Sequence, residues 1–389
     1  MTAPAPAGAR LPDFRLETFF SRWEFAAKHH LTASDAETMT LRELLALGTE
    51  DARALFAELP LGYTETWGTT RLRQAIAGTY ATCGPEDVLA FAGAEEAIYW
   101  AMQLLAGPGD HVVVTVPNYQ ALETVPRAGG AEVSGVLLRE EEGWRLDVDA
   151  VRAALRPNTT LLAVNFPNNP TGAVPDHTTW RALVELCEER GIRLLSDEVY
   201  RGLELDPDRT LTQAADMSAT AVSINVTSKS YGLPGLRVGW IACRDHALLE
   251  ALERHKHYTS ICNAGPSELL ASIALGAGDQ IHARNRGIVS ENLPLFGAFF
   301  SQHADLFDWT PPDGGCVAFP RYRGSDGVEA FCQELVETEG VLLLPASVYA
   351  SELGSVPADR FRIGVGRRNP APALAAFDRF LSSRATRHR

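Results

Sequence analysis

Short apolar runs alternate with helix-type patterns through the middle of the chain, and this alternation most constrains the fold. The runs cover His111–Val116, Glu132–Leu138, Thr160–Asn165, Ile192–Ser196, Ala221–Val226 and Val238–Cys243. Stretches such as Val148–Leu155 and Thr178–Arg190 show the spacing of amphipathic helices. A strand that is apolar on both sides is buried on both faces, which is typical of parallel strands joined by helices. The pattern predicts an α/β fold around a mostly parallel sheet.

The 389 residues exceed one typical domain, so we expect more than one structural unit. Residues 1–48 are predicted to form an N-terminal arm and part of a small domain, 49–290 a large domain, and 291–389 a C-terminal small α+β domain. A mainly helical segment, Leu249–Phe300, is expected to join the two domains. The small domain is predicted from strand patterns and helix patterns that alternate, at Gly315–Pro320, Asp326–Glu339, Gly340–Pro345 and Ala371–Leu381.

Charge and cysteine usage exclude several functional classes. The formal charge of −14 lacks the basic footprint that nucleic acids and anionic membranes require. The six cysteines form no C-x-x-C pair, so we expect reduced thiols and neither a disulfide framework nor a metal site. No apolar run has the length of a membrane span or a signal peptide. We therefore expect a soluble cytoplasmic protein.

Chemically suggestive residues follow the predicted strands. Tyr119 follows the first run, Asn169 the third, Asp197 the fourth and Lys229 the fifth. In parallel sheets, ligands bind beyond the carboxyl ends of the strands. These side chains are therefore predicted to meet at one edge of the sheet.

Lys229 is conspicuous because only three of the 35 lysines and arginines are lysines. It lies in Ser228–Gly239, after a strand pattern and before a Gly/Pro-rich turn. An amine can act as a nucleophile and form an imine, whereas a guanidinium stays protonated. A solvated surface lysine is the alternative interpretation.

Three further segments carry weaker signals. Asn165–Gly172 is rich in turn residues and is, taken alone, only a rigid loop. Ser196–Tyr200 places Asp197 directly after a buried strand, where a carboxylate needs a cation or a donor, and a structural ion pair would also satisfy it. Gly93–Glu96 begins a predicted helix whose N–H groups can bind an anion.

Together and in this order, these segments resemble the fold-type I pyridoxal-phosphate enzymes, specifically the class I/II aminotransferase family. The resemblance extends from about Leu61 to Gly366. It implies that Lys229 binds pyridoxal 5'-phosphate (PLP) and that Asp197 pairs with the ring nitrogen. It also implies that Arg237 and the start of the helix at Ala94 and Glu95 bind the phosphate.

The same resemblance implies further contacts with cofactor and substrate. Asn169 and Tyr200 are expected at the 3-oxygen of the ring, and Tyr119 on the ring face. Arg362 is expected to bind the substrate carboxylate; the alternative interpretation of this arginine is an ordinary interface salt bridge. Tyr63 is expected to reach the phosphate of a neighbouring subunit, so a homodimer with shared active sites is implied.

One position departs from the family pattern. Val226 stands where the family usually has a serine or threonine that contacts the phosphate. Ser228 or Thr227 is expected to replace it. The phosphate site is therefore less completely defined by the sequence than the lysine.

The arm segment Trp23–Glu37 and two later segments, Ser228–Arg237 and Gly314–Arg321, resemble one branch of the family. That branch contains capreomycidine synthase and the streptolidine cyclases of streptothricin antibiotic pathways. It implies loss of the β-hydroxyl of a hydroxylated arginine and closure of a ring by the guanidine. Asp35 or Glu37 is then expected at the guanidinium, and His29 or its neighbour His30 at the leaving hydroxyl.

Other readings remain open at this point. For any single arm residue, a charged turn that faces a dimer partner is an equal alternative. Asn168–Gly172 and Ser196–Tyr200 are what ordinary aminotransferases show, so transamination is the alternative reaction. A PLP-dependent arginine oxidase or lyase is a third reading, and a non-catalytic binding module with the same fold is a fourth.

Overall fold

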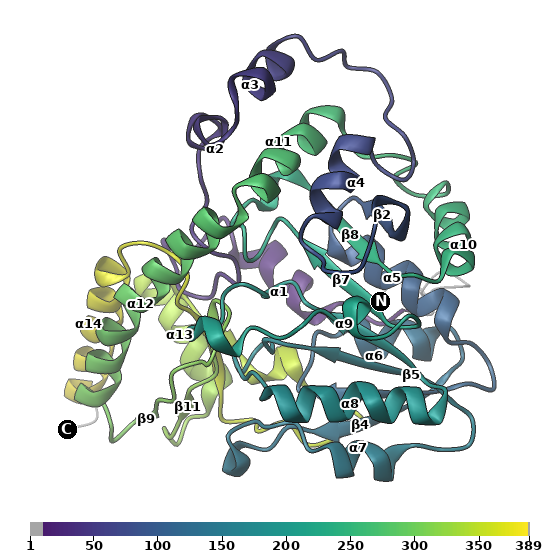
Figure 1. Ribbon diagram of the computed structural model, residues 1–389. Coiled ribbons are helices and arrows are strands. Elements are labelled where there is room, and N and C mark those ends of the chain that lie inside the picture. The colour runs from purple at the N-terminus through teal and green to yellow at the C-terminus, as the bar shows by residue number, and fades with distance from the viewer. Residues whose placement is uncertain (1–10, 388–389) are drawn as a thin grey trace, which may run out of the picture.

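A seven-stranded sheet forms the centre of the computed structural model, which describes residues 11–387 (Figure 1). Its order is β2-β8-β7-β6-β5-β3-β4. All neighbouring strands are parallel except that β8 runs antiparallel to both β7 and β2. The strands are β2 (Val88–Phe91), β3 (His111–Val116), β4 (Glu132–Leu137), β5 (Thr159–Asn165), β6 (Arg193–Asp197), β7 (Val222–Val226) and β8 (Gly239–Ala242). The predicted α/β class with a mostly parallel sheet is confirmed.

Helices cover both faces of this sheet. Alternate residues of β3 face opposite sides, so Val113 packs in one apolar cluster, while Val112 and Val114 pack in another. The Val113 side is covered by α7 (Val148–Ala154) and α8 (His177–Arg190), and the other side by α5 (Ala94–Leu105), α6 (Ala121–Ala128) and α10 (His246–Lys256). This two-sided burial explains why the strands are nearly continuous apolar runs.

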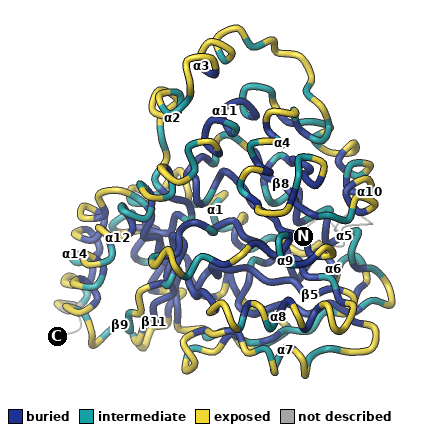
Figure 2. The backbone as a smooth tube through the Cα atoms, viewed as in Figure 1, coloured by how far each residue is buried: buried dark blue, intermediate teal, exposed yellow. Residues whose placement is uncertain are grey.

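The segment between the sheet and the C-terminal elements is helical, as predicted. It contains α11 (Gly265–Gly276) and the 25-residue α12 (Gly278–Gln302). The short α9 (Ala214–Met217) precedes β7. On the N-terminal side the helices are α1 (Arg15–Trp23), α2 (Leu41–Leu47), α3 (Glu50–Ala57) and α4 (Thr70–Ala77). Figure 2 shows the central sheet buried, whereas α2 and α3 are largely exposed.

The C-terminal part contains three small sheets together with the helices α13 (Val328–Glu339) and α14 (Ala371–Arg387). The predicted strand over residues 340–345 is divided in two because its halves pair with different partners. The small sheets pair β1 (His29–His30) with β12 (Val341–Leu342), β9 (Phe307–Asp308) with β11 (Arg321–Tyr322), and β14 (Phe361–Gly364) with both β10 (Val317–Ala318) and β13 (Leu344–Pro345).

One apolar cluster continues from the sheet into these C-terminal elements, from Leu162 and Trp180 to Phe361 and Phe377. The division into three parts along the chain stays a prediction. Among residues 11–387, no helix is both long and apolar enough to cross a membrane.

Candidate active site

A cavity of about 930 Å³ opens at the carboxyl ends of the parallel strands. Tyr119, Asn169, Asp197 and Lys229 all line it, as their positions after the strands predict. Residues 14–35 form another wall, and β14 contributes Arg362. The tertiary structure thus brings three distant parts of the chain to one edge of the sheet.

Lys229 lies in the loop after β7, and its Nζ donates a hydrogen bond to Ser34 Oγ at 2.8 Å. Its main-chain carbonyl accepts a hydrogen bond from the Ala36 N–H at 3.2 Å. Burial lowers the pKa of the Lys229 amine, because a charged ammonium loses its hydration there, while the nearby Asp35 carboxylate acts the other way. The surroundings therefore favour the neutral, nucleophilic amine.

Asp197 ends β6 and is almost completely buried. Its Oδ1 accepts a hydrogen bond from the Val199 N–H at 3.2 Å. Burial raises the pKa of Asp197 to about 7, although this hydrogen bond and Lys229 oppose the rise. A buried carboxylate with so little compensation suits a ligand that brings a proton or a positive charge.

Arg362 is fully buried in β14 and pairs with no carboxylate in the described part of the chain. Its Nη1 donates to Tyr349 Oη at 2.8 Å and to Asn169 Oδ1 at 3.3 Å. Its Nη2 donates to the Thr32 carbonyl at 2.8 Å. These neutral partners orient the guanidinium but leave its charge unbalanced, which suits an anionic ligand group.

Phosphate-type donors gather where α5 begins. Gly93 has φ +100°, which favours glycine, and a Cβ there would lie 2.5 Å from Arg237 Nη2, so a larger residue would displace this guanidinium. Ser228 Oγ is buried in the cavity wall without a hydrogen-bond partner, whereas Thr227 Oγ1 donates to main-chain carbonyls. Ser228 and not Thr227 is therefore the hydroxyl available beside the apolar wall at Val226.

Two tyrosines, Tyr119 and Tyr200, also line the cavity. Tyr119 lies with its ring centroid 5.2 Å from that of Phe14. Tyr200 Oη is buried without a partner, and burial raises the pKa of this phenol. The Arg237 guanidinium donates to the carbonyls of Pro234 and Ala92 but pairs with no carboxylate among the described residues. Together with the unpaired Ser228 and Tyr200 hydroxyls and the buried Asp197, it fits an aromatic ring that carries a phosphate and a basic nitrogen.

Glu95 enters the cavity with its side chain as well as through its place in the first turn of α5. Burial raises the pKa of Glu95 to about 7, and Tyr119 partly opposes this rise. The carboxyl group therefore approaches its neutral form near pH 7. A neutral acid can donate a hydrogen bond and repels an anion less than a carboxylate does.

Several arm residues lie differently from the sequence-based expectation. His29 does not line the cavity, but His30 does, because neighbouring residues of strand β1 point to opposite sides. Glu37 also lies outside the lining, and its Oε2 accepts a hydrogen bond from the Arg368 N–H. Asp35 lines the cavity but is paired with Arg367 at 2.7 Å.

Tyr63 is 93% exposed and does not line the cavity of its own chain. This placement is compatible with a role in a neighbouring subunit. Its assignment to a partner's phosphate stays a prediction.

Sequence reasoning missed other lining residues, most of them in the N-terminal arm. Ser34 lies inside the segment singled out as rich in acid, base and hydroxyl groups, but nothing local distinguishes it from its neighbours. Helix α1 carries Glu17, and the turn after it carries Glu24. Tyr349 is brought to Asn169 only by tertiary folding. No local sequence pattern could have identified these contacts.

Comparisons with known proteins agree with this geometry. The family model "Aminotransferase class I and II" matches residues 33–374. A capreomycidine synthase from Streptomyces vinaceus is 32% identical over 394 residues, which cover 99% of this chain and 98% of that protein. The arginine–pyruvate transaminase AruH from Pseudomonas aeruginosa is 32% identical over 326 residues, which cover 78% of this chain and 77% of that protein.

A solved structure extends the likeness to three dimensions. The PLP-dependent cyclase OrfR superposes with a TM-score of 0.88 at 28% identity, over 98% of this chain and 100% of that chain. The matched region includes the strand-end residues and Lys229. This chain belongs to the class I and II aminotransferase family and is an enzyme that uses pyridoxal 5'-phosphate as its cofactor.

Proposed function

We propose that the protein is a PLP-dependent cyclase that acts on a β-hydroxylated arginine in antibiotic biosynthesis. The substrate would lose its β-hydroxyl as water and close a capreomycidine-type ring through its own guanidine. One observation carries the proposal: the cavity is lined by a buried guanidinium that has no carboxylate partner and by carboxylates that have no cationic partner among the described residues. An amino acid with a cationic side chain matches that distribution of charge.

Arg362 supplies the cationic end and is oriented for an α-carboxylate by Tyr349 and Thr32. The acidic wall comes from Glu17 and Glu24, neither of which is in an ion pair with a described residue. Burial raises the pKa of Glu24, and the nearby Glu17 and Asp35 carboxylates raise it further. A guanidinium between these acids would relieve their repulsion.

The comparisons support an arginine-like substrate. The capreomycidine synthase matches nearly the whole chain, and the OrfR cyclase covers the arm as well as the core. The AruH relative is a transaminase that is named for arginine. We therefore replace Glu37 with Glu17 and Glu24 as the proposed guanidinium-binding residues.

Bound PLP would supply an electron sink for the charge that develops at the substrate Cα. Arg237, Ser228 and the first turn of α5 would hold its phosphate, and Asp197 would keep its ring nitrogen protonated. Asn169 and Tyr200 would lie at its 3-oxygen and Tyr119 at its face. Lys229 would anchor it and then, once displaced by the substrate amine, would take the Cα proton.

The later steps need one acid and return every proton. His30 in its protonated form would donate a proton to the β-hydroxyl as the Cβ–O bond breaks and water leaves. Burial lowers the pKa of His30, which makes this form rarer and a stronger acid. The guanidinium would give a proton back to His30, and its nitrogen lone pair would form the new bond at Cβ. Lys229 would return the proton to Cα. The net change is the loss of one water, without an oxidant or a second substrate.

The decisive experiment incubates the holoenzyme with 3-hydroxyarginine and with dihydroxyarginine and follows the products by mass spectrometry. We expect loss of water and a cyclic product without added keto acid. Arginine without a β-hydroxyl is the matched control substrate and should give no such product. The Lys229→Ala protein should be inactive.

Transamination is the second candidate, and the AruH relative favours it. Turnover that occurs only when pyruvate is added would establish it in place of the cyclase. Hydrogen peroxide release would instead indicate an oxidase. The lack of a borohydride-sensitive visible absorbance band in the wild-type protein would indicate a non-catalytic binding module.

We further propose a cytoplasmic homodimer with shared active sites. All six cysteines are free, which suits a reducing compartment. The exposed Tyr63 suits a contribution to the partner's site.

A further inference from the structure

Ser34 is the arm residue whose side chain contacts the reactive amine. Its Oγ accepts the hydrogen bond from Lys229 Nζ at 2.8 Å and lies in the cavity wall. The same hydroxyl is close enough to the Tyr200 phenol to lower its pKa against the rise caused by burial. The Ser34 hydroxyl thus adjoins two groups expected at the reaction centre.

The main chain around Ser34 is held in a fixed place. The Ala36 N–H donates to the Lys229 carbonyl at 3.2 Å, so the arm contacts both ends of this residue. On the other side, the Gly364 N–H donates to the Leu31 carbonyl at 2.8 Å, and the Glu37 N–H donates to the Gly366 carbonyl at 2.9 Å. A Cβ at Gly364 would lie against the Ala33 carbonyl oxygen, so the arm and β14 approach as closely as backbones allow.

We propose that Ser34 is a positioning residue that orients the Lys229 amine for proton transfer at the substrate Cα. The amine sits on a flexible four-carbon chain and gains direction only from its partners. A hydrogen bond to a hydroxyl on a fixed backbone restricts that freedom. Because it also stabilises the ammonium, the Ser34 hydroxyl opposes the loss of basicity that burial causes.

The inference rests on Lys229 as the Cα base and is independent of what happens after deprotonation. Other charged and titratable groups that act on Lys229 come from every surrounding element and stay in place in Ser34 variants. They are Glu17 of α1, Glu24 in the turn after α1, Asp35 of the arm, Asp197 of β6, Cys316 before β10, and Arg362 of β14.

The test uses Ser34→Ala, Ser34→Thr and the matched control Thr38→Ala, which removes an exposed arm hydroxyl outside the cavity. The first readout is the rate at which the holoenzyme exchanges the Cα proton of arginine with solvent deuterium. We expect Ser34→Ala to slow the exchange about tenfold, Ser34→Thr to retain most of it, and Thr38→Ala to match the wild type.

The second readout is the pKa of each lysine, followed by NMR of protein with isotope-labelled lysine before cofactor is added. With only three lysines, Lys28 and Lys256 serve as internal references. Ser34→Ala should lower the pKa of Lys229 by about one unit and move the acidic limb of the exchange profile to lower pH. A Lys229 pKa and an exchange profile equal to those of the wild type would overturn the proposal.

These outcomes separate the inference from the proposed function. If the wild-type protein fails to catalyse the cyclase reaction but Ser34→Ala exchanges the Cα proton about ten times more slowly, the proposed role of Ser34 still holds. Exchange that persists in Lys229→Ala would remove the basis of the inference, because another group would then be the base.

Discussion

Lys229 and Asp197 line the same cavity, Asp197 buried and Lys229 half-buried, and the loss of hydration there favours the neutral form of each. It lowers the pKa of the amine and raises the pKa of Asp197 to about 7. A neutral amine is what Cα deprotonation requires, so burial helps Lys229. Asp197 must be ionised to pair with a protonated ring nitrogen, so its charge depends on the cofactor being bound.

We predict opposite effects of Asp197→Asn on stability and on chemistry. The pKa of Asp197 rises from its ordinary 3.8 to about 7, so the folded cofactor-free protein holds this proton more tightly than the unfolded chain. Stability therefore falls as pH increases between these two values and stays lower above them. The Asp197→Asn protein lacks this loss and should be more stable above pH 7, on the order of 4 kcal/mol, with the difference vanishing below pH 4.

Denaturant unfolding of cofactor-free protein across this pH range measures the stability effect. With cofactor, Asp197→Asn should nearly abolish Cα exchange while some cofactor stays bound. Unchanged exchange would contradict the role of Asp197. Equal stability of the two proteins at pH 8 would contradict the raised pKa.

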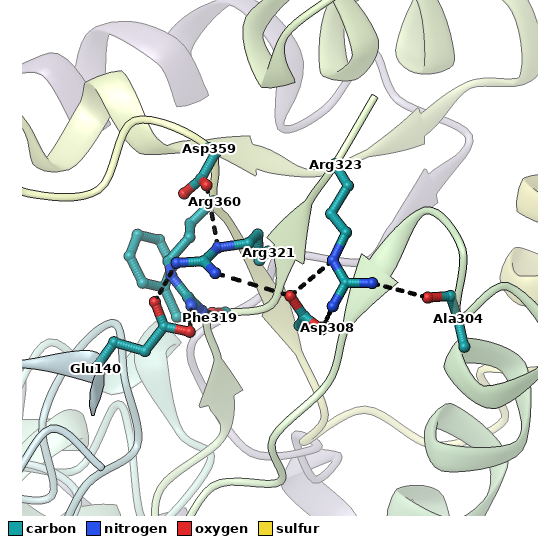
Figure 3. Close-up of polar contacts among 8 residues, drawn as sticks. All are labelled: Glu140, Ala304, Asp308, Phe319, Arg321, Arg323, Asp359 and Arg360. Carbon is teal, nitrogen blue, oxygen red and sulfur yellow. Dashed lines mark hydrogen bonds and ion pairs between the residues drawn. The ribbon is translucent and has the colours of Figure 1, made fainter. Parts of the chain in front are cut away.

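At the scale of elements, one network of ion pairs joins the turn after β4 to the C-terminal strands (Figure 3). Glu140, in the 3-10 turn Glu140–Glu142, contacts both Arg321 of β11 and Arg360. The Arg360 side chain is only 5% exposed and lies over the Trp144 ring, with its Cζ 5.1 Å from the ring centroid. Arg360 immediately precedes β14, so this network anchors the strand that carries Arg362.

We predict that Glu140→Gln destabilises the protein by about 2–3 kcal/mol, because it leaves the buried Arg360 charge without its carboxylate. Glu141→Gln is the matched control, since Glu141 is exposed and lies 3.9 Å from Arg139. Equilibrium unfolding in urea measures both variants. Equal midpoints for the two proteins would show that the Glu140 pairs contribute nothing.

At the scale of the whole molecule, exposed apolar side chains gather on the loop between α3 and α4 and on the turn after α10. Leu61 is 85% exposed and Tyr258 is 88% exposed. Thr64 Oγ1 donates to the Asn263 carbonyl at 2.7 Å, so the two segments lie side by side. Large exposed apolar surfaces of this kind are typical of interfaces.

We predict that Leu61→Asp weakens the proposed homodimer at least tenfold, because an unpaired carboxylate would have to be buried in the interface. Sedimentation velocity measures the assembly, and Leu295→Asp, at an exposed apolar position on α12, is the matched control. Cofactor affinity should fall with the dimer if Tyr63 serves the partner's site. A wild-type protein that sediments as a monomer would contradict the proposal.

The sequence by itself determined the sheet and the residues at its strand ends. Strands buried on both faces must be apolar at nearly every position, and residues after parallel strands must share one edge. Asn169, Asp197 and Lys229 could therefore be placed together from the sequence alone. The antiparallel direction of β8 could not be predicted from the sequence, because an apolar run has the same pattern in either direction.

Only the tertiary structure decided which arm residues reach the cavity. Whether His29 or His30 lines the cavity depends on which side of β1 faces it. That orientation depends on the pairing of β1 with β12, more than 300 residues later in the chain. Glu17, Glu24 and Ser34 are likewise set by how the arm packs against β14 and the Lys229 loop. Such contacts join segments far apart in the chain, and no local pattern of side chains encodes them.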